Sequence, residues 1–300
     1  MKYRLCLYLI FLLSALSTMA QHGAGAQVHE GGYGLVKTNI TATYDHTFGR
    51  VTNGFNARAS YEFLKKTHIT LSANLRYQTV TTGFRQSDLD TLCSPDAINL
   101  NGTHHMGQAG ITATARAMLF GKPMMGIGIV NSEWGKGGFN RVSATLMALL
   151  MLKADRSTQF GVGVLGMINT TSRMPVFPVF FYRHRINPQW LINLYGGMLG
   201  VDYNATPNDL FSIGADVDVK SFYFRPGVEW LPKTCRYTQT NFRPMLKYRR
   251  RILTNLYFDA QTGYAVNMRT RVNAVNGRKT YLKLSQNPHP FLQFTVSYSL

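Results

Sequence analysis

The chain has 300 residues, of which 45% are hydrophobic and 15% charged, and its formal net charge at pH 7 is +18. No run of 18 or more apolar residues occurs beyond the N-terminus, which argues against a helical membrane protein. In a soluble protein such a basic charge would suggest nucleic-acid binding, but the export signal described next argues against a nucleic-acid partner.

The N-terminus has the three parts of a secretory signal peptide. Lys2 and Arg4 form a basic start, residues 5–16 are apolar but too few to span a bilayer, and a small-residue cleavage site ends at Ala20. An uncleaved N-terminal membrane anchor is the alternative. We therefore expect a signal peptide at residues 1–20 and divide the rest of the chain into a flexible lead-in, residues 21–33, and a main domain, residues 34–300.

Alternation of apolar and polar residues begins near residue 36 and continues through most of the chain. Segments 36–48, 51–63 and 69–77 alternate with few exceptions and are separated by short turns. At nine to thirteen residues, such strands exceed the five or six that are usual in globular proteins, and they suit a tilted membrane strand. A soluble β-sandwich also alternates and is the alternative.

The same alternation of apolar and polar residues predicts the remaining strands. We place them at 109–119, 124–134, 142–152, 160–168, 176–186, 190–203, 211–219, 242–249, 252–266 and 292–300. Dividing 190–203 at Gly196-Gly197 gives fourteen strands, and leaving it whole gives thirteen. Single-chain bacterial barrels have even strand numbers and both ends in the periplasm. We therefore predict an all-β fold, a closed antiparallel transmembrane β-barrel of about fourteen strands, with twelve as the alternative. Residues 34–300 form this outer-membrane β-barrel, and residues 21–33 form a flexible periplasmic lead-in.

Three long polar segments interrupt this pattern, at 80–107, 225–241 and 267–289, and we place all three outside the cell. Cys93 and Cys235 lie in two of these segments. An exported protein can form a disulfide, so these two cysteines form either a disulfide or two free thiols, because the sequence does not set their separation.

The last strand is apolar on one face and ends the chain. Leu292, Phe294, Val296, Tyr298 and Leu300 alternate with polar residues. Phe294, Val296, Tyr298 and Leu300 resemble the C-terminal assembly signal of bacterial outer-membrane barrels, which usually ends in Phe. This resemblance implies insertion by the barrel-assembly machinery into the bacterial outer membrane, where the partners are membrane lipid and lipopolysaccharide.

Several short motifs resemble a family of Bacteroidota outer-membrane β-barrels that is catalogued as a domain of unknown function. The resemblance covers most of residues 30–300, and it implies an outer-membrane location and no agreed activity. The motifs are Gly161-Val162-Gly163-Val164, Pro175-Val176-Phe177-Pro178 with Tyr182, Asn187-Pro188-Gln189-Trp190, Leu246-Lys247-Tyr248-Arg249 and Gly263-Tyr264.

Charged residues on the polar faces of the strands are the candidate site residues. An Arg or Lys facing lipid at the midplane costs roughly 2–4 kcal/mol, so alternation directs these side chains into the lumen. They are either selectivity residues that favour anions or structural charges that pair with Glu62 and Asp45. The candidates are Lys37, Arg58, Glu62, Arg76, Arg116 and Arg141.

Catalytic and metal-binding alternatives rest on one loop, which carries Ser87, Asp88, Asp90, His104 and His105. Ser, His and an acid are the groups of a hydrolytic triad, but no G-x-S-x-G elbow is present. Adjacent histidines point in opposite directions on a strand, so both could bind one metal ion only from a loop. We predict no catalytic residue, no metal site and no cofactor.

The sequence is consistent with three functions. The first is a porin-like passive channel with a basic lumen, and the second is a non-conducting structural or interaction barrel that works through its extracellular loops. The third is a lipid-modifying outer-membrane enzyme. The absence of catalytic motifs favours the first two, and the basic polar faces fit either a selective or a structural lumen.

Overall fold

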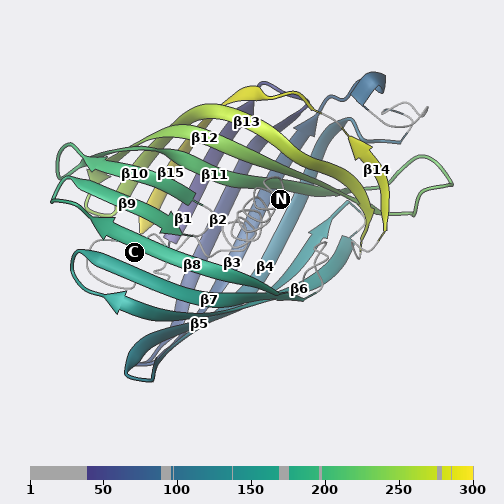
Figure 1. Cartoon of the computed structure of the whole chain (residues 1–300). Helices are drawn as coiled ribbons and strands as arrows, with labels where there is room; N and C mark the ends of the chain where they lie inside the picture. Colours follow the sequence, from purple (N-terminus) through teal and green to yellow (C-terminus); the bar gives the residue numbers. More distant parts are fainter. Residues whose placement is uncertain are drawn as a thin grey trace, which may run out of the picture.

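The computed structural model describes residues 39–88, 96, 98–136, 138–168, 176–195, 198–275, 279–284 and 286–299. Antiparallel strands follow one another around a closed ring, in which β15 pairs with β1 (Figure 1). No helix in these ranges is long and apolar enough to cross a membrane.

Fourteen strands form the ring, and a fifteenth, β14, pairs with β13 alone. A short 3-10 helix, η1, spans Gln86–Asp88. The strands are β1 (Asn39–Thr47), β2 (Val51–Lys65), β3 (Ile69–Thr82), β4 (Gly102–Leu119), β5 (Lys122–Gly135), β6 (Gly138–Ala154), β7 (Thr158–Ile168), β8 (Val176–Arg185), β9 (Trp190–Tyr195), β10 (Met198–Asn204), β11 (Asp209–Phe224), β12 (Cys235–Leu253), β13 (Leu256–Ala274), β14 (Thr280–Leu284) and β15 (His289–Ser299).

The two ends of the barrel differ in their connections. At one end, which we call the turn end, strands are joined by short turns such as 66–68, 120–121 and 254–255. The long connections 83–101 and 225–234 gather at the other end, the loop end. The turn end lies at the left in Figure 1, together with the C-terminus.

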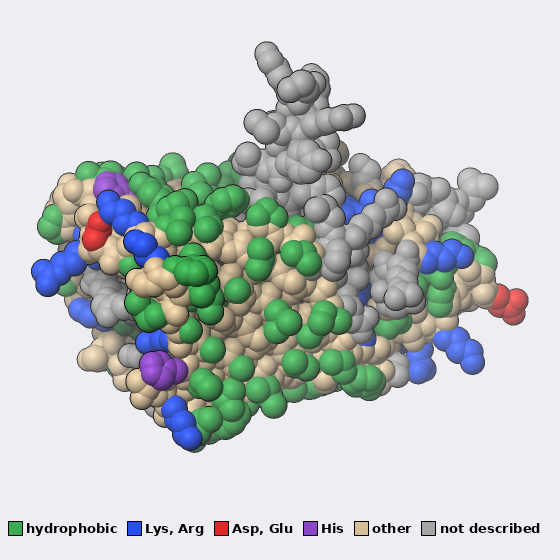
Figure 2. All heavy atoms as spheres, turned by 60° about the horizontal axis from the view of Figure 1, so that its bottom comes forward, with side chains coloured by type: hydrophobic (Ala, Val, Ile, Leu, Met, Phe, Trp, Pro, Cys, Tyr) green, Lys and Arg blue, Asp and Glu red, His purple; other side chains and the backbone are tan. Residues whose placement is uncertain are grey.

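The outward face of the wall is apolar. Alternate residues along each strand expose large hydrophobic side chains, among them Ile40, Leu75, Ile111, Leu146 and Ile213. In Figure 2, hydrophobic side chains cover the middle of the wall, whereas Lys and Arg gather at both ends. An apolar band around a closed wall with satisfied backbone hydrogen bonds is the form in which β-structure spans a bilayer.

The predicted closed barrel of fourteen strands is confirmed, and so is the division of 190–203 into two strands, β9 and β10. The predicted long loops are shorter than expected: β4 begins at Gly102, β12 begins at Cys235 and β13 continues to Ala274. Above the apolar zone both faces of a strand can be polar, so hydrogen-bonded pairing continues where the alternation of hydrophobicity stops.

One strand leaves the wall at the loop end. β10 pairs with β11 only along Leu210–Ala215, and beyond Ala215 the strand partner of β11 in the described structure is β12 alone. This upper part of β11, residues 216–224, instead comes close to β3, β4 and β5. We call residues 216–224 the partition. In Figure 1, β9 and β10 occupy only the left part of the molecule, whereas β11 continues to the right beside β12.

Apolar side chains fill the loop end on the β1–β3 side of the partition. Phe222 and Phe224 project from the partition into this cluster, which also takes side chains from two long connections and from β14. This side of the lumen is therefore a packed core at the loop end. Its buried members are Val51, Val80, Phe84, Ile98, Leu100, Phe222, Phe224, Leu231, Cys235, Tyr237, Val272, Leu282 and Leu284.

Candidate lumen site

Five polar residues stand directly opposite one another on successive strands of the inner wall. Arg58 of β2 pairs with Arg76 of β3, Arg76 with Gln108 of β4, Gln108 with Glu133 of β5, and Glu133 with Arg141 of β6. Directly opposed Cβ atoms lie about 4.5–5.5 Å apart. These five residues therefore form one continuous polar line, which we call the arginine row.

The alternation of each strand places the arginine row on the inside. The chain neighbours of its members, such as Ala59, Leu75, Tyr77 and Val142, are exposed on the outer face. Because successive side chains of a strand point to opposite faces, the row must face the lumen. An outward arginine at mid-membrane would cost roughly 2–4 kcal/mol.

At the β5–β6 end of the row, three groups converge on one carboxylate oxygen. The Tyr223 hydroxyl, from the partition, donates a hydrogen bond to Oε2 of Glu133. Nε of Arg141 lies 3.8 Å from the same oxygen, and Nη2 of Arg236, from β12, lies 3.6 Å from it. All four side chains are buried. The partition is thus attached to the opposite wall through Glu133.

The β2–β3 end of the row is held by amides. Nε of Arg76 donates to Oδ1 of Asn56 at 3.0 Å, and Nη2 donates to Oε1 of Gln78 at 2.8 Å. Arg76 also interacts electrostatically with Arg58, and with two carboxylates that include Glu133. The row is therefore one electrostatic unit with more arginines than carboxylates.

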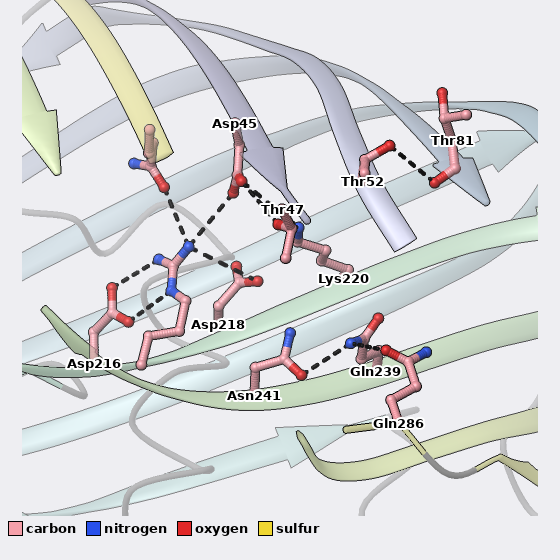
Figure 3. A network of polar contacts seen from close by, with 12 residues as sticks. Asp45, Thr47, Thr52, Thr81, Asp216, Asp218, Lys220, Gln239, Asn241 and Gln286 are labelled. Carbon is pink, nitrogen blue, oxygen red and sulfur yellow. Dashed lines mark hydrogen bonds and ion pairs between the residues drawn. The ribbon is translucent and has the colours of Figure 1, made fainter. Parts of the chain in front are cut away.

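A second buried network lies on the opposite face of the partition and centres on Arg243 of β12. Figure 3 shows three of its members, Asp45, Asp216 and Asp218. The Arg243 guanidinium donates to both oxygens of Asp216, at 2.9 and 2.8 Å, and to Asp45 at 3.4 Å and Gln293 at 3.2 Å. Asp218 lies 4.0 Å from Nη1. The network links β11 and β12 to β1 and β15.

Lys220 adds a further link between the partition and β1. Its Nζ donates to Oγ1 of Thr47 at 2.7 Å and lies 3.7 Å from Oδ1 of Asp45. Asp45 thus interacts with Lys220 of the partition and with Arg243 of β12. This corrects the expectation that Asp45 pairs with the predicted lumen arginines.

The predicted lumen residues fall into two groups. Arg58, Arg76 and Arg141 lie in the arginine row. Glu62 lies near the turn end, where Lys65 is 3.7 Å away, and Arg116 lies near the same end in register with Met125. Neither Glu62 nor Arg116 is a member of the arginine row. Lys37 lies outside the described residues.

Sequence reasoning missed Glu133, Lys220, Arg236 and Arg243, which hold both networks together. Glu133 continues the inward parity of Asn131 on β5, and that parity could have identified it. Arg236 was hidden because residues 225–241 were expected to form a loop. Which carboxylates meet which arginines depends on the inward course of β11, for which the sequence contains no signal.

His104 and His105 point to opposite faces of β4. The His104 ring stacks on Phe222 with ring centroids 4.0 Å apart, and its Nε2 lies 3.1 Å from the Leu100 carbonyl oxygen. His105 is exposed, and its Nδ1 lies 2.8 Å from the Tyr77 hydroxyl. Within the described ranges, no three His, Cys, Asp or Glu residues are grouped to hold a metal ion.

Cys235 is buried in the loop-end core and is free within the described residues, with its Sγ 3.9 Å from the Pro232 carbonyl oxygen. The choice between a disulfide and two free thiols stays a prediction. Cys93, the other cysteine of the predicted disulfide, lies outside the described residues.

The closing strand has the orientation that its pattern predicts. Phe294, Val296 and Tyr298 are exposed on the outer face of β15 and stand opposite Tyr44, Ala42 and Ile40 of β1. Leu300 lies outside the described residues. The role of this strand as an assembly signal stays a prediction.

Part of the inner wall is apolar rather than charged. Neighbouring strands β6, β7 and β8 bury a cluster that includes two methionines, and Met125, Met147 and Phe181 pack against it. The lumen therefore has a polar wall along β2–β6 and an apolar patch beside it. The buried members of this patch are Leu149, Met151, Leu165, Met167, Phe177 and Val179.

No family model and no curated protein matches this chain. Among solved structures, a FadL homologue from Pseudomonas aeruginosa has 9% identity and a TM-score of 0.43, over 89% of this chain and 91% of that one. An outer membrane channel from Pseudomonas putida has 11% identity and a TM-score of 0.43, over 90% and 98%. The KdgM porin has 9% identity and a TM-score of 0.35, over 87% and 99%.

Proposed function

We propose that this chain is an outer-membrane channel that passes small solutes passively and prefers anions. The arginine row is the observation that carries this proposal. Arg58, Arg76 and Arg141 line the inner wall beside a single carboxylate of the row, Glu133. A ring or row of cations along a pore favours anions because it lowers their electrostatic energy relative to cations.

The path follows the β5–β10 side of the partition. On the other side, the loop end is filled by the apolar core around Phe222 and Phe224 and by the networks of Arg243 and Lys220. A solute that enters along β5 and β6 meets Glu133, Arg141 and Arg236, so this convergence forms the selective part of the path.

Export by the signal peptide 1–20 and assembly through the C-terminal strand belong to the same proposal. The outward apolar band supports insertion into a bilayer, and the basic residues at both ends suit contact with anionic headgroups. Membrane lipid and lipopolysaccharide are therefore the proposed surroundings, with the barrel-assembly machinery as the partner during insertion.

A non-conducting barrel is the second candidate, and the filled loop end favours it. An apolar core and the buried network of Arg243 and Lys220 occupy space that an open pore would leave to water. The enzyme alternative draws no comparable support, because His104 and His105 lie on opposite faces of β4.

Single-channel recording decides between the two candidates. Purified protein is reconstituted into a planar bilayer, and the reversal potential is measured in a salt gradient. Steady openings with a reversal potential toward that of chloride are expected. Silence from protein that still shows heat-modifiable mobility on a gel would contradict the channel and leave the non-conducting barrel.

A further inference from the structure

Two buried guanidiniums share one carboxylate at the β5–β6 end of the arginine row. Arg141 and Arg236 both lie within 4 Å of Oε2 of Glu133, and neither forms an ion pair with another acid of the described structure. Their relative exposures are 6% and 7%. One carboxylate balances one arginine, so a positive charge is left over where solvent screening is weak.

The hydrogen-bonding groups of these arginines are also incompletely used. Nε and Nη1 of Arg141 and Nε of Arg236 are buried, and among the described residues they have no hydrogen-bond partner. A buried donor without a partner destabilises the fold, and a charged one does so more strongly. Both the surplus charge and the donors therefore call for an added acceptor with negative charge.

We propose that Arg141 and Arg236 bind an oxyanion, the carboxylate or phosphate group of a small solute. A guanidinium is a planar fork whose N–H groups match two oxygens of such a group, which gives directional hydrogen bonds as well as charge. A halide ion is a single spherical acceptor, so it gains less binding energy from the directional N–H groups of a guanidinium. The proposal extends the proposed function by naming the class of anion, and its biological role rests on that function.

Glu133 and Tyr223 set the geometry and strength of this site. The Tyr223 hydroxyl donates to the carboxylate that faces both arginines, so the partition holds Glu133 in place. Glu133 also competes with the solute for the two guanidiniums. Removing its charge should therefore strengthen oxyanion binding, whereas removing either arginine should weaken it.

The test compares anions at constant ionic strength. Thermal unfolding of the purified protein in detergent is followed while inorganic phosphate or acetate replaces chloride, because a ligand that binds the folded state raises the unfolding midpoint. We expect a saturable rise with at least one oxyanion, and the two titrations show whether phosphate or carboxylate is preferred. Equal midpoints in all three anions would overturn the proposal, and this comparison needs only the natural chain.

Variants then locate the site. Arg141→Gln and Arg236→Gln each leave Glu133 with one arginine, so both should fold, and each should weaken oxyanion binding at least tenfold. Glu133→Gln should tighten binding, and Arg156→Gln, at an exposed turn, should leave it unchanged. Arg236→Lys keeps the charge without the fork. If Arg236→Lys binds as tightly as the natural chain, directional recognition by a guanidinium is wrong.

Failure of the channel and failure of this site give different results. Oxyanion-dependent stabilisation without conductance keeps the site and contradicts the channel. Conductance without oxyanion-dependent stabilisation keeps the channel and contradicts the site.

Discussion

The Arg243 guanidinium donates two hydrogen bonds to the Asp216 carboxylate directly across the β11–β12 ladder, at 2.9 and 2.8 Å. Asp216 is the first residue of the partition, one position beyond Ala215, where β11 loses β10 as a partner. The pair therefore holds β11 to β12 at the point where the wall divides. Contacts from Arg243 to Asp45 and Gln293 fix this point to the β1–β15 seam.

Replacing Arg243 with methionine should destabilise the barrel strongly. Removing one partner of a buried ion pair leaves carboxylates without a counter-charge, which costs about 3–5 kcal/mol. The measurement is the urea midpoint of unfolding in detergent. Arg251→Met is the control, because Arg251 is exposed and bonds only Asn208 in the described structure, and its effect should stay within about 0.5 kcal/mol. Similar midpoints for both variants would contradict a structural role for the network.

Removing charge from the arginine row should lower anion preference. Arg58→Gln with Arg76→Gln removes two adjacent lumen charges, and a unit charge 4 Å from a permeating ion is worth about 1 kcal/mol in water. Each substitution should therefore lower the ratio of anion to cation permeability by roughly fivefold or more, because the anion loses this energy and the cation gains a similar amount; the ratio is read from the reversal potential. Lys66→Gln, at an exposed turn, is the matched control. A ratio unchanged by the double variant would assign these arginines to structure alone.

The sequence predicted the wall better than the interior. Period-two alternation in strands such as β3 marks which side chains meet lipid, so strand number, direction and closure follow from local pattern and parity. No sequence pattern indicates that β11 turns into the lumen. Val217 and Tyr223 are hydrophobic, as lipid-facing residues are, but both are buried. Glu133 and Arg236 are 103 positions apart in the sequence, and only the inward course of β11 brings them together.

Strands β6 and β7 approach each other closely at Gly163, so we expect that a residue with a side chain is not tolerated at this position. A Cβ at Gly163 would lie 2.1 Å from the Ala148 carbonyl oxygen, which is backbone and cannot move aside cheaply. Gly163→Ala should cost about 1–3 kcal/mol, as overpacking does. At Gly126 of β5, the nearest atom to an added Cβ is 3.9 Å away, so Gly126→Ala is the control and should change the unfolding midpoint little. Equal midpoints would contradict the contact.

The β6–β7 turn predicts a pH dependence that originates in Asp155. Its carboxylate accepts hydrogen bonds from the backbone N–H of Thr158 and from the Ser157 hydroxyl and N–H, at 2.9 and 3.0 Å for Ser157. The Thr158 N–H first, and then the Ser157 hydroxyl, lower the pKa of Asp155 from 3.8 to about 2. A carboxyl whose pKa is depressed by folding stabilises the fold above its unfolded pKa and loses that contribution as pH falls through the folded value.

Asp155→Ala should therefore lower the unfolding midpoint at pH 7 and pH 5, and the difference from the natural chain should shrink as the pH falls from about 4 toward 2. Asp155→Asn keeps an acceptor oxygen but cannot ionise, so the midpoint difference between Asn and Ala should not change through that range. Thermal unfolding in detergent across pH 2 to 7 gives the comparison. A difference between Asp155→Ala and the natural chain that was as large at pH 2 as at pH 7 would show that the ionised carboxylate is not what stabilises this turn.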